Sequence, residues 1–228
     1  MFKIRIVLIA LFSFLCSAAF PVDCNYPSCK FDLNNWKLQI PGPKEIKDLD
    51  KYSSNYFYLT KDNEMCFGLD AEEQGHTKNS EYVRSELRHI VNWSIQETHE
   101  ISAEIRVVSK AVPDKVTVLQ IHGIMPDNTN APPFLRIAVN NGGLYAFIKT
   151  ENSGEKTESV LLEKNINGNF FKADIKVQDG NLSVSVNGLE KLNMNAGYWK
   201  YMNYFKAGCY PQAKKGNILV FFRSLSVK

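Results

Sequence analysis

The sequence has 228 residues, with 27 Lys and Arg against 24 Asp and Glu, and a formal net charge of +3. Residues 1–19 are typical of a signal peptide, because a basic start is followed by an apolar stretch too short to span a membrane and by the small residues Ser17-Ala18-Ala19. Without this leader the chain keeps 25 basic side chains and is almost neutral, which argues against a general polyanion-binding surface.

Residues 20–228 are enough for a single all-β domain, and no other segment is apolar for long enough to cross a bilayer. We therefore expect a secreted (extracellular) monomer that binds neither nucleic acid nor membrane and needs no cofactor. Removal of Cys16 with the leader leaves Cys24, Cys29, Cys66 and Cys209, and an even number in an exported chain favours two disulfides. Of the three possible pairings we favour Cys24 with Cys29 and Cys66 with Cys209. Without a Cys-x-x-Cys pair, these residues do not suggest a metal site.

In chain order, residues 41–52 are charged and indicate a loop or a short helix, whereas short β-branched and aromatic runs dominate from Phe57 onward. Loops rich in Gly, Asn, Pro and Ser fall at residues 74–80, 126–133 and 151–156. The clearest hairpin joins residues 173–178 to 182–186 through Asp179-Gly180-Asn181. This pattern predicts a β-sandwich or jelly roll. The expected strands span residues 98–107, 116–122, 135–139, 144–150, 171–177, 182–186 and 218–227.

Three of the segments place polar side chains on one face of a strand. Residues 82–88 alternate so that Arg84, Glu86 and Arg88 share a face. Taken alone, that face could be a solvated surface with cross-strand ion pairs. In residues 118–123, Gln120 and His122 share a face opposite apolar neighbours. Buried polar groups of this kind need partners, whereas the remaining histidines are best interpreted as structural.

The third segment covers residues 204–212. Tyr204, Lys206, Tyr210 and Gln212 share a face with Gly208, whose missing side chain leaves room for a ligand, while Cys209 points to the core. An amphipathic edge strand is the alternative interpretation, since this segment contains a proline.

Together the three faces offer the groups that β-elimination from a uronate requires. Arg and Gln donors stabilise the charge that develops on the carboxylate when the C5 proton leaves. A neutral imidazole is suited to accept that proton near neutral pH, and a tyrosine beside cations is suited to protonate the departing O4 oxygen. We find no closely spaced pair of carboxylates on one strand, which argues against a glycoside hydrolase.

The same segments resemble the alginate lyases of polysaccharide lyase family 7. Its three blocks look like Arg-Ser-Glu-Leu-Arg, Gln-Ile-His and Tyr-Phe-Lys-Ala-Gly-x-Tyr-x-Gln, and all three occur here in that order, after a family-like start at residues 35–41. The resemblance implies an all-β, concanavalin-like jelly-roll β-sandwich of two antiparallel sheets, with the glycan in the groove of the concave sheet. It also implies 1,4-bond cleavage in alginate by β-elimination, leaving 4,5-unsaturated uronate ends.

Carried over by motif, Arg84 and Gln120 neutralise the carboxylate, His122 assists there or acts as base, and Tyr210 protonates the leaving oxygen. For mannuronate Tyr210 could do both tasks, because the C5 proton and the leaving oxygen lie on the same side. For guluronate they lie on opposite sides, so His122 is the expected base. Ile121, between Gln and His, tilts the expectation toward guluronate-containing blocks. The residues expected to hold the substrate or order the site are Glu86, Arg88, Tyr204, Lys206 and Gln212.

Two other functions stay open on the sequence alone: a lyase of the same fold for another polyuronate such as glucuronan, and a noncatalytic carbohydrate-binding sandwich. The sequons at Asn92 and Asn181 would carry glycans only after secretion through a eukaryotic pathway.

Overall fold

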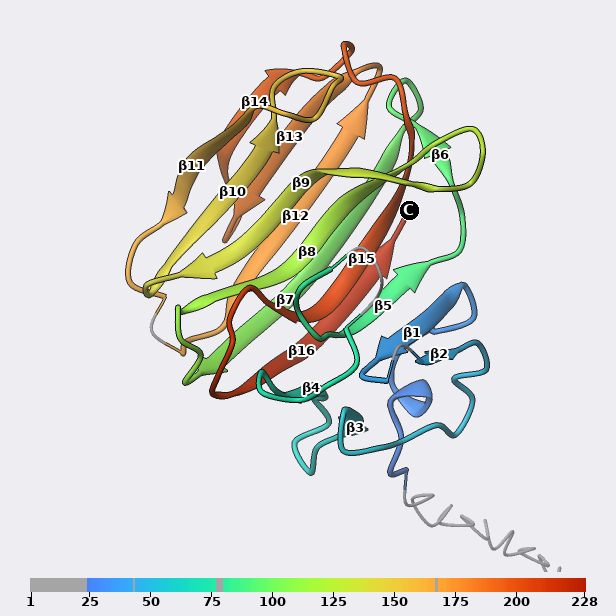
Figure 1. Ribbon diagram of the computed structural model, residues 1–228, viewed down its shortest axis with the longest axis vertical. Coiled ribbons are helices and arrows are strands. Elements are labelled where there is room, and N and C mark those ends of the chain that lie inside the picture. The colour runs from blue at the N-terminus through green and yellow to red at the C-terminus, as the bar shows by residue number, and fades with distance from the viewer. Residues whose placement is uncertain (1–23, 43, 77–79, 167) are drawn as a thin grey trace, which may run out of the picture.

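Figure 1 shows the protein as a computed structural model, which describes residues 24–42, 44–76, 80–166 and 168–228. Two antiparallel sheets lie one behind the other, and the predicted all-β jelly-roll sandwich is confirmed. The predicted signal peptide, residues 1–19, lies outside the described residues. Within the described part of the chain, no helix is long and apolar enough to cross a membrane.

The first sheet carries the candidate site. Its strands follow the order β11-β10-β9-β8-β15-β5-β1-β2, and β6 pairs with β15. In chain order they are β1 (Trp36–Ile40), β2 (Lys44–Ile46), β5 (Ser85–His89), β6 (Trp93–Ser94), β8 (Lys115–Ile124), β9 (Asn130–Asn140), β10 (Gly143–Lys149), β11 (Thr157–Glu163) and β15 (Met202–Pro211).

The second sheet covers the back of the first. Its order is β14-β13-β12-β7-β16-β4-β3. These strands are β3 (Phe57–Leu59), β4 (Met65–Asp70), β7 (His99–Ser109), β12 (Phe171–Gln178), β13 (Asn181–Val186), β14 (Leu189–Asn195) and β16 (Asn217–Val227), and a 3-10 helix η1 (Pro27–Cys29) precedes them.

Alternation along the strands builds the core between the sheets. On β12, for example, Ala173, Ile175 and Val177 are fully buried while Lys172 and Lys176 are exposed. Burying each side chain of Val or Ile size contributes about 1.5–3 kcal/mol relative to leaving it in water. One apolar row per strand therefore fixes the register and leaves the other row free for chemistry.

The predicted strands and the hairpin are found, but the loop boundaries differ. β12 and β13 pair from Ala173 with Val186 to Gln178 with Asn181, and Asp179 and Gly180 both have positive φ, as a tight primed turn requires. The predicted loop at residues 126–133 is shorter, because β9 already begins at Asn130 and Pro133 pairs with His122 across an irregular ladder. Likewise, the segment 41–52 contains the short strand β2 rather than a helix.

One of the two predicted disulfides is confirmed and the other is wrong. Cys24 and Cys29 are bonded, whereas Cys66 and Cys209 are free and buried. The alternation of side chains between the two faces of β4 explains why the second pairing is wrong. Met65 and Phe67 on β4 face the core, so Cys66 between them points to the outer face of the second sheet, beside Tyr58. Cys209 belongs to the core between the sheets, on the other side of β4.

Thiol labelling tests this pairing. Burial raises the pKa of Cys66 to about 11 and that of Cys209 well above its usual value, so neither forms the reactive thiolate readily. We expect the folded, unreduced protein to label slowly, and the unfolded, unreduced protein to release two thiols, those of Cys66 and Cys209. Finding neither thiol after unfolding without reductant would instead show that they are bonded.

Candidate active site

The three polar faces predicted from the sequence meet on the outer surface of the first sheet. β15 lies between β8 and β5, and Lys206 is the register partner of Gln120 on one side and of Arg88 on the other. A groove of about 610 Å³ opens there. Seven of the nine predicted residues line it: Arg84, Arg88, Gln120, His122, Tyr204, Lys206 and Tyr210.

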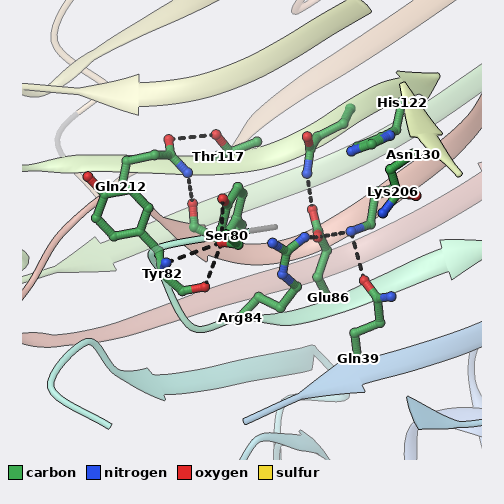
Figure 2. Close-up of polar contacts among 12 residues, drawn as sticks. Gln39, Ser80, Tyr82, Arg84, Glu86, Thr117, His122, Asn130, Lys206 and Gln212 are labelled. Carbon is green, nitrogen blue, oxygen red and sulfur yellow. Dashed lines mark hydrogen bonds and ion pairs between the residues drawn. The ribbon is translucent and has the colours of Figure 1, made fainter. Parts of the chain in front are cut away.

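Glu86 is the anionic centre beneath the groove, and it is fully buried. Its carboxylate forms an ion pair with Lys206 and a longer one, 3.4 Å, with Nη1 of Arg84. Figure 2 shows Arg84 and Glu86 between Ser80 on one side and Lys206 and His122 on the other. Burial alone would raise the pKa of Glu86, but the two cations and its hydrogen bonds lower that pKa overall. Glu86 is therefore ionised and holds its cations in place.

Glu86 also sets the orientation of Gln120. The Nε2 amide of Gln120 donates a hydrogen bond to Oε1 of Glu86, and an ionised carboxylate can only accept. The amide nitrogen must therefore face Glu86, which leaves Oε1 of Gln120 buried without a partner among the described residues. One N–H of the amide remains available for a ligand.

His122 and Tyr204 form a stacked pair at one end of the groove. Their rings lie 5.2 Å apart at 16°, and Arg88 covers the Tyr204 ring at 4.0 Å. Nδ1 of His122 lies 2.9 Å from the carbonyl oxygen of Gly123, an acceptor, so Nδ1 carries the proton of the neutral ring. Nε2 then keeps a free lone pair. Burial, and next the charge of Lys206, lower the pKa of His122 to about 3.

Tyr210 is held by contacts to its ring and its hydroxyl. The Arg84 guanidinium lies 4.1 Å from the ring centroid, within cation–π range, and the hydroxyl oxygen is 2.9 Å from that of Ser80. Its main-chain carbonyl accepts a hydrogen bond from Nε2 of Gln212. These contacts fix where the phenol hydroxyl lies.

Comparison with known proteins identifies the family of this chain. The family model described as alginate lyase matches residues 31–228. The chain belongs to the alginate lyases. The curated alginate lyase of Photobacterium sp. (strain ATCC 43367) is 25% identical over 88% of this chain and 85% of that protein.

Solved structures of alginate lyases share the fold. The family 7 alginate lyase A1-II′, as a Tyr-to-Phe variant in complex with a product (GGG), is 33% identical, covers 89% of this chain and 98% of its own, and gives a TM-score of 0.84. An alginate lyase from Pseudomonas aeruginosa is 27% identical over 86% of this chain and 99% of its own, with a TM-score of 0.77. A1-II′ is a member of polysaccharide lyase family 7, so the resemblance found in the sequence is confirmed and the protein is a polysaccharide lyase.

Two residues of this alginate lyase have other surroundings than we predicted. Gln212 does not line the groove, because its Oε1 accepts from the Thr117 hydroxyl and its Nε2 bonds the main chain. Gly208 leaves no room for a ligand. It has a φ of 148° in an irregular part of β15, and a Cβ there would lie 2.6 Å from the carbonyl oxygen of Ser85. A glycine is needed at this position because β5 approaches closely.

The sequence prediction missed several groove residues. Gln39 accepts a hydrogen bond from Nζ of Lys206 at 2.9 Å, and Asn130 accepts one from the Tyr204 hydroxyl at 3.4 Å. Arg136 on β9 lines the groove 5.8 Å from the Tyr210 ring. Gln39 and Arg136 alternate with apolar neighbours on their strands, so the same periodicity signal was available for them. Ser80 lies in a loop and carries no such signal.

Among the described residues, no group of three or more His, Cys, Asp and Glu side chains is arranged to hold a metal ion.

Proposed function

We propose that this polysaccharide lyase cleaves the 1,4-glycosidic bonds of alginate by β-elimination and leaves 4,5-unsaturated uronate ends. The observation that carries the proposal is the convergence of Arg84, Gln120, His122 and Tyr210 on one groove, built around the buried carboxylate of Glu86. Supporting it, the family 7 relative A1-II′ has been solved with a product (GGG) and with a substrate (GGMG).

Arg84 and Gln120 neutralise the uronate carboxylate. Removing the C5 proton pushes negative charge into that group, and donors placed there in advance stabilise the charge as it forms. Arg84 offers the guanidinium hydrogens that Glu86 does not take, and Gln120 offers its second amide hydrogen. Loss of one such donor typically lowers the rate on the order of a hundredfold to a thousandfold.

His122 and Tyr210 move the proton. The Nε2 lone pair of His122 accepts the C5 proton of guluronate, the C4–O4 bond breaks, a C4–C5 double bond forms, and the Tyr210 hydroxyl protonates the departing oxygen. Mannuronate has the C5 proton and the leaving oxygen on the same side, so there Tyr210, starting as the phenolate, takes the C5 proton and then passes it to the departing oxygen. Glu86, Arg88, Tyr204 and Lys206 order the groove and hold neighbouring sugars, and Gln212 positions Tyr210.

The pH profile tests the state of His122. With a pKa of about 3 in the free enzyme, the imidazole is already neutral throughout the usual pH range. We therefore expect log(kcat/KM) to show no acidic limb due to His122 between about pH 5 and 8, although an unperturbed histidine titrates near ~6.5. An acidic limb near that value, lost in His122→Asn, would contradict this. The anionic substrate raises the pKa once bound, so the test requires kcat/KM rather than kcat.

We favour guluronate-containing blocks as the substrate. Ile121 is fully buried and faces the core behind Gln120 and His122, so it can act on specificity only by positioning those two side chains. The A1-II′ complexes with GGG and GGMG support the same choice.

We also propose that residues 1–19 direct export of residues 20–228, which act outside the cell as a single monomeric domain. The N-terminal residue of the exported protein and its mass in solution test this. Asn92 and Asn181 are both exposed, so either sequon would be accessible to a eukaryotic glycosylation system.

Absorbance of the unsaturated product tests the proposed function directly. The protein is incubated with alginate, with its guluronate-rich and mannuronate-rich blocks, and with glucuronan. We expect product from alginate and fastest release from guluronate-rich blocks. Product from glucuronan alone would assign the enzyme to that polymer. Binding without product from any of the four would favour a noncatalytic carbohydrate-binding role.

A further inference from the structure

A row of register partners crosses the sheet at right angles to the strands and passes through the candidate site. Each neighbour in the row is paired in the ladder, and all face the groove side of the sheet. The row runs through Lys37 on β1, Arg88 on β5, Lys206 on β15, Gln120 on β8, Arg136 on β9 and Phe147 on β10. Adjacent strands are about 4.8 Å apart, comparable with the length of one sugar in an extended glycan.

Arg136 is the cation of this row that has neither an ion pair nor a hydrogen bond among the described residues, and its Nε is buried without a partner. Lys37 and Lys206 pair with carboxylates, and Arg88, which has no ion pair there either, donates hydrogen bonds to the His89 carbonyl and the Asn92 side chain. Three other arginines, by contrast, form ion pairs with carboxylates: Arg84 contacts Glu86, and Arg106 and Arg223 contact Glu64. Burial lowers the pKa of Arg136, which means that its charged form is held at a cost.

Two further cations flank Arg136. Nζ of Lys115 lies 4.0 Å from the Phe147 ring centroid, and Nζ of Lys149 donates to the Thr157 hydroxyl at 2.7 Å. For both lysines burial, followed by the charge of Arg136, lowers the pKa. Neither forms an ion pair with an acid in the described part of the chain. Three cations without a facing carboxylate thus lie beside the groove, on the β9–β10 side of the site.

An anionic ligand would offset the cost of burying these unpaired cations. A buried cation without a partner is costly, and a carboxylate that accepts hydrogen bonds from a guanidinium removes that cost on binding. A uronate polymer supplies one carboxylate per sugar, and a chain following the row passes from Gln120 to Arg136 within one strand spacing. A neutral sugar would leave the guanidinium unpaired.

We propose that Arg136, with Lys115 and Lys149 beside it, binds the carboxylate of a uronate next to the cleavage centre on the β9–β10 side, and that this contact makes the enzyme favour longer chains. The inference rests on the proposed function. Arg136 grips the substrate equally before and during the reaction, so it acts on KM rather than on kcat. It is a substrate-binding residue, distinct from the groups that move the proton.

Kinetics on oligouronates of increasing length test the proposal. Arg136→Gln is compared with the parent, with Arg136→Lys as the conservative change and with Lys176→Gln, an exposed cation of the other sheet, as the matched control. We expect Arg136→Gln to raise KM by about ten- to a hundredfold on oligomers long enough to reach β9, with kcat within about twofold, since a hydrogen bond to a charged group has that strength. Arg136→Lys should recover part of the affinity, and Lys176→Gln should behave like the parent.

Chain length and stability separate binding from a structural role. The shortest oligomers that are cleaved should lose nothing in Arg136→Gln, and its melting temperature should equal or exceed that of the parent, because an unpaired buried cation is removed. An equal loss of kcat at every length together with a lower melting temperature would overturn the proposal, as would an unchanged KM at every length.

Calorimetric binding distinguishes failure of this inference from failure of the proposed function. A parent that releases no unsaturated product contradicts the proposed function, yet weaker binding of a long oligouronate to Arg136→Gln would still support the carboxylate contact. A parent that cleaves alginate while Arg136→Gln binds and cleaves all lengths like the parent overturns the contact alone.

Discussion

Replacing Tyr210 by phenylalanine is expected to lower kcat on oligoguluronate on the order of a hundredfold to ten-thousandfold, because the variant has no hydroxyl to protonate the leaving oxygen. The ring and its contact with the Arg84 guanidinium, 4.1 Å from the centroid, remain, and only the contact with the Ser80 hydroxyl is lost. Substrate binding should therefore stay within a few-fold of the parent. Initial rates and calorimetric binding on the same oligomer measure both effects.

Tyr58→Phe is the matched control for this experiment. Tyr58 lies on β3 of the other sheet and pairs with Cys66, away from the groove. Its variant should turn over like the parent. Unaltered turnover in Tyr210→Phe would remove Tyr210 from the reaction, and equal losses of binding and turnover would make it a binding residue.

Replacing Glu86 by glutamine is expected to have the largest effect on stability. The change keeps the shape but leaves the buried ammonium of Lys206 and the guanidinium of Arg84 without their carboxylate. Breaking one partner of a buried ion pair costs about 3–5 kcal/mol, which for a protein of this size lowers the melting temperature by roughly 6–20 °C. Gln120 also loses the acceptor that orients its amide, so kcat should fall as well.

The pH dependence of unfolding tests whether ionised Glu86 stabilises the folded protein. The pKa of Glu86 is lowered in the folded protein, so its stabilisation is present above its ordinary value of 4.5 and is lost as the pH falls below it. In Glu86→Gln this contribution to acid sensitivity should vanish. Glu155→Gln, at an exposed loop position, is the control and should melt like the parent. A Glu86→Gln variant as stable as the parent at pH 7 would contradict the role of Glu86 as anionic centre.

Much of the fold follows from local rules that act on neighbouring residues. The β12–β13 hairpin is set by alternation on both arms and by an Asp-Gly turn, and both were readable. The start of β9 was not, because Pro132 and Pro133 suggest a loop but occupy an irregular edge of the ladder. The predicted disulfide of Cys66 was wrong for a related reason: the face of the sheet to which Cys66 points depends on which residues of β4 enter the core.

The candidate site was predictable wherever its residues alternate with apolar ones on a strand. Arg84, Gln120 and Lys206 were found in this way, although their convergence depends on β15 inserting between β5 and β8, which no local pattern reveals. The role of Gly208 could not be predicted in this way, because a glycine is required there by the close approach of another strand. Ser80 reaches Tyr210 from a loop, so only the folded chain brings them together.

The oxygen content of the products tests most directly whether the groove breaks the glycosidic bond by elimination. A defined oligoguluronate is cleaved in heavy-oxygen water and the fragments are weighed by mass spectrometry at early times, before the reducing ends exchange. If the bond breaks by elimination, we expect fragments whose masses sum to that of the substrate, with one unsaturated end and no oxygen from the solvent. Fragments that together gain one molecule of water and carry heavy oxygen would show hydrolysis and would contradict elimination.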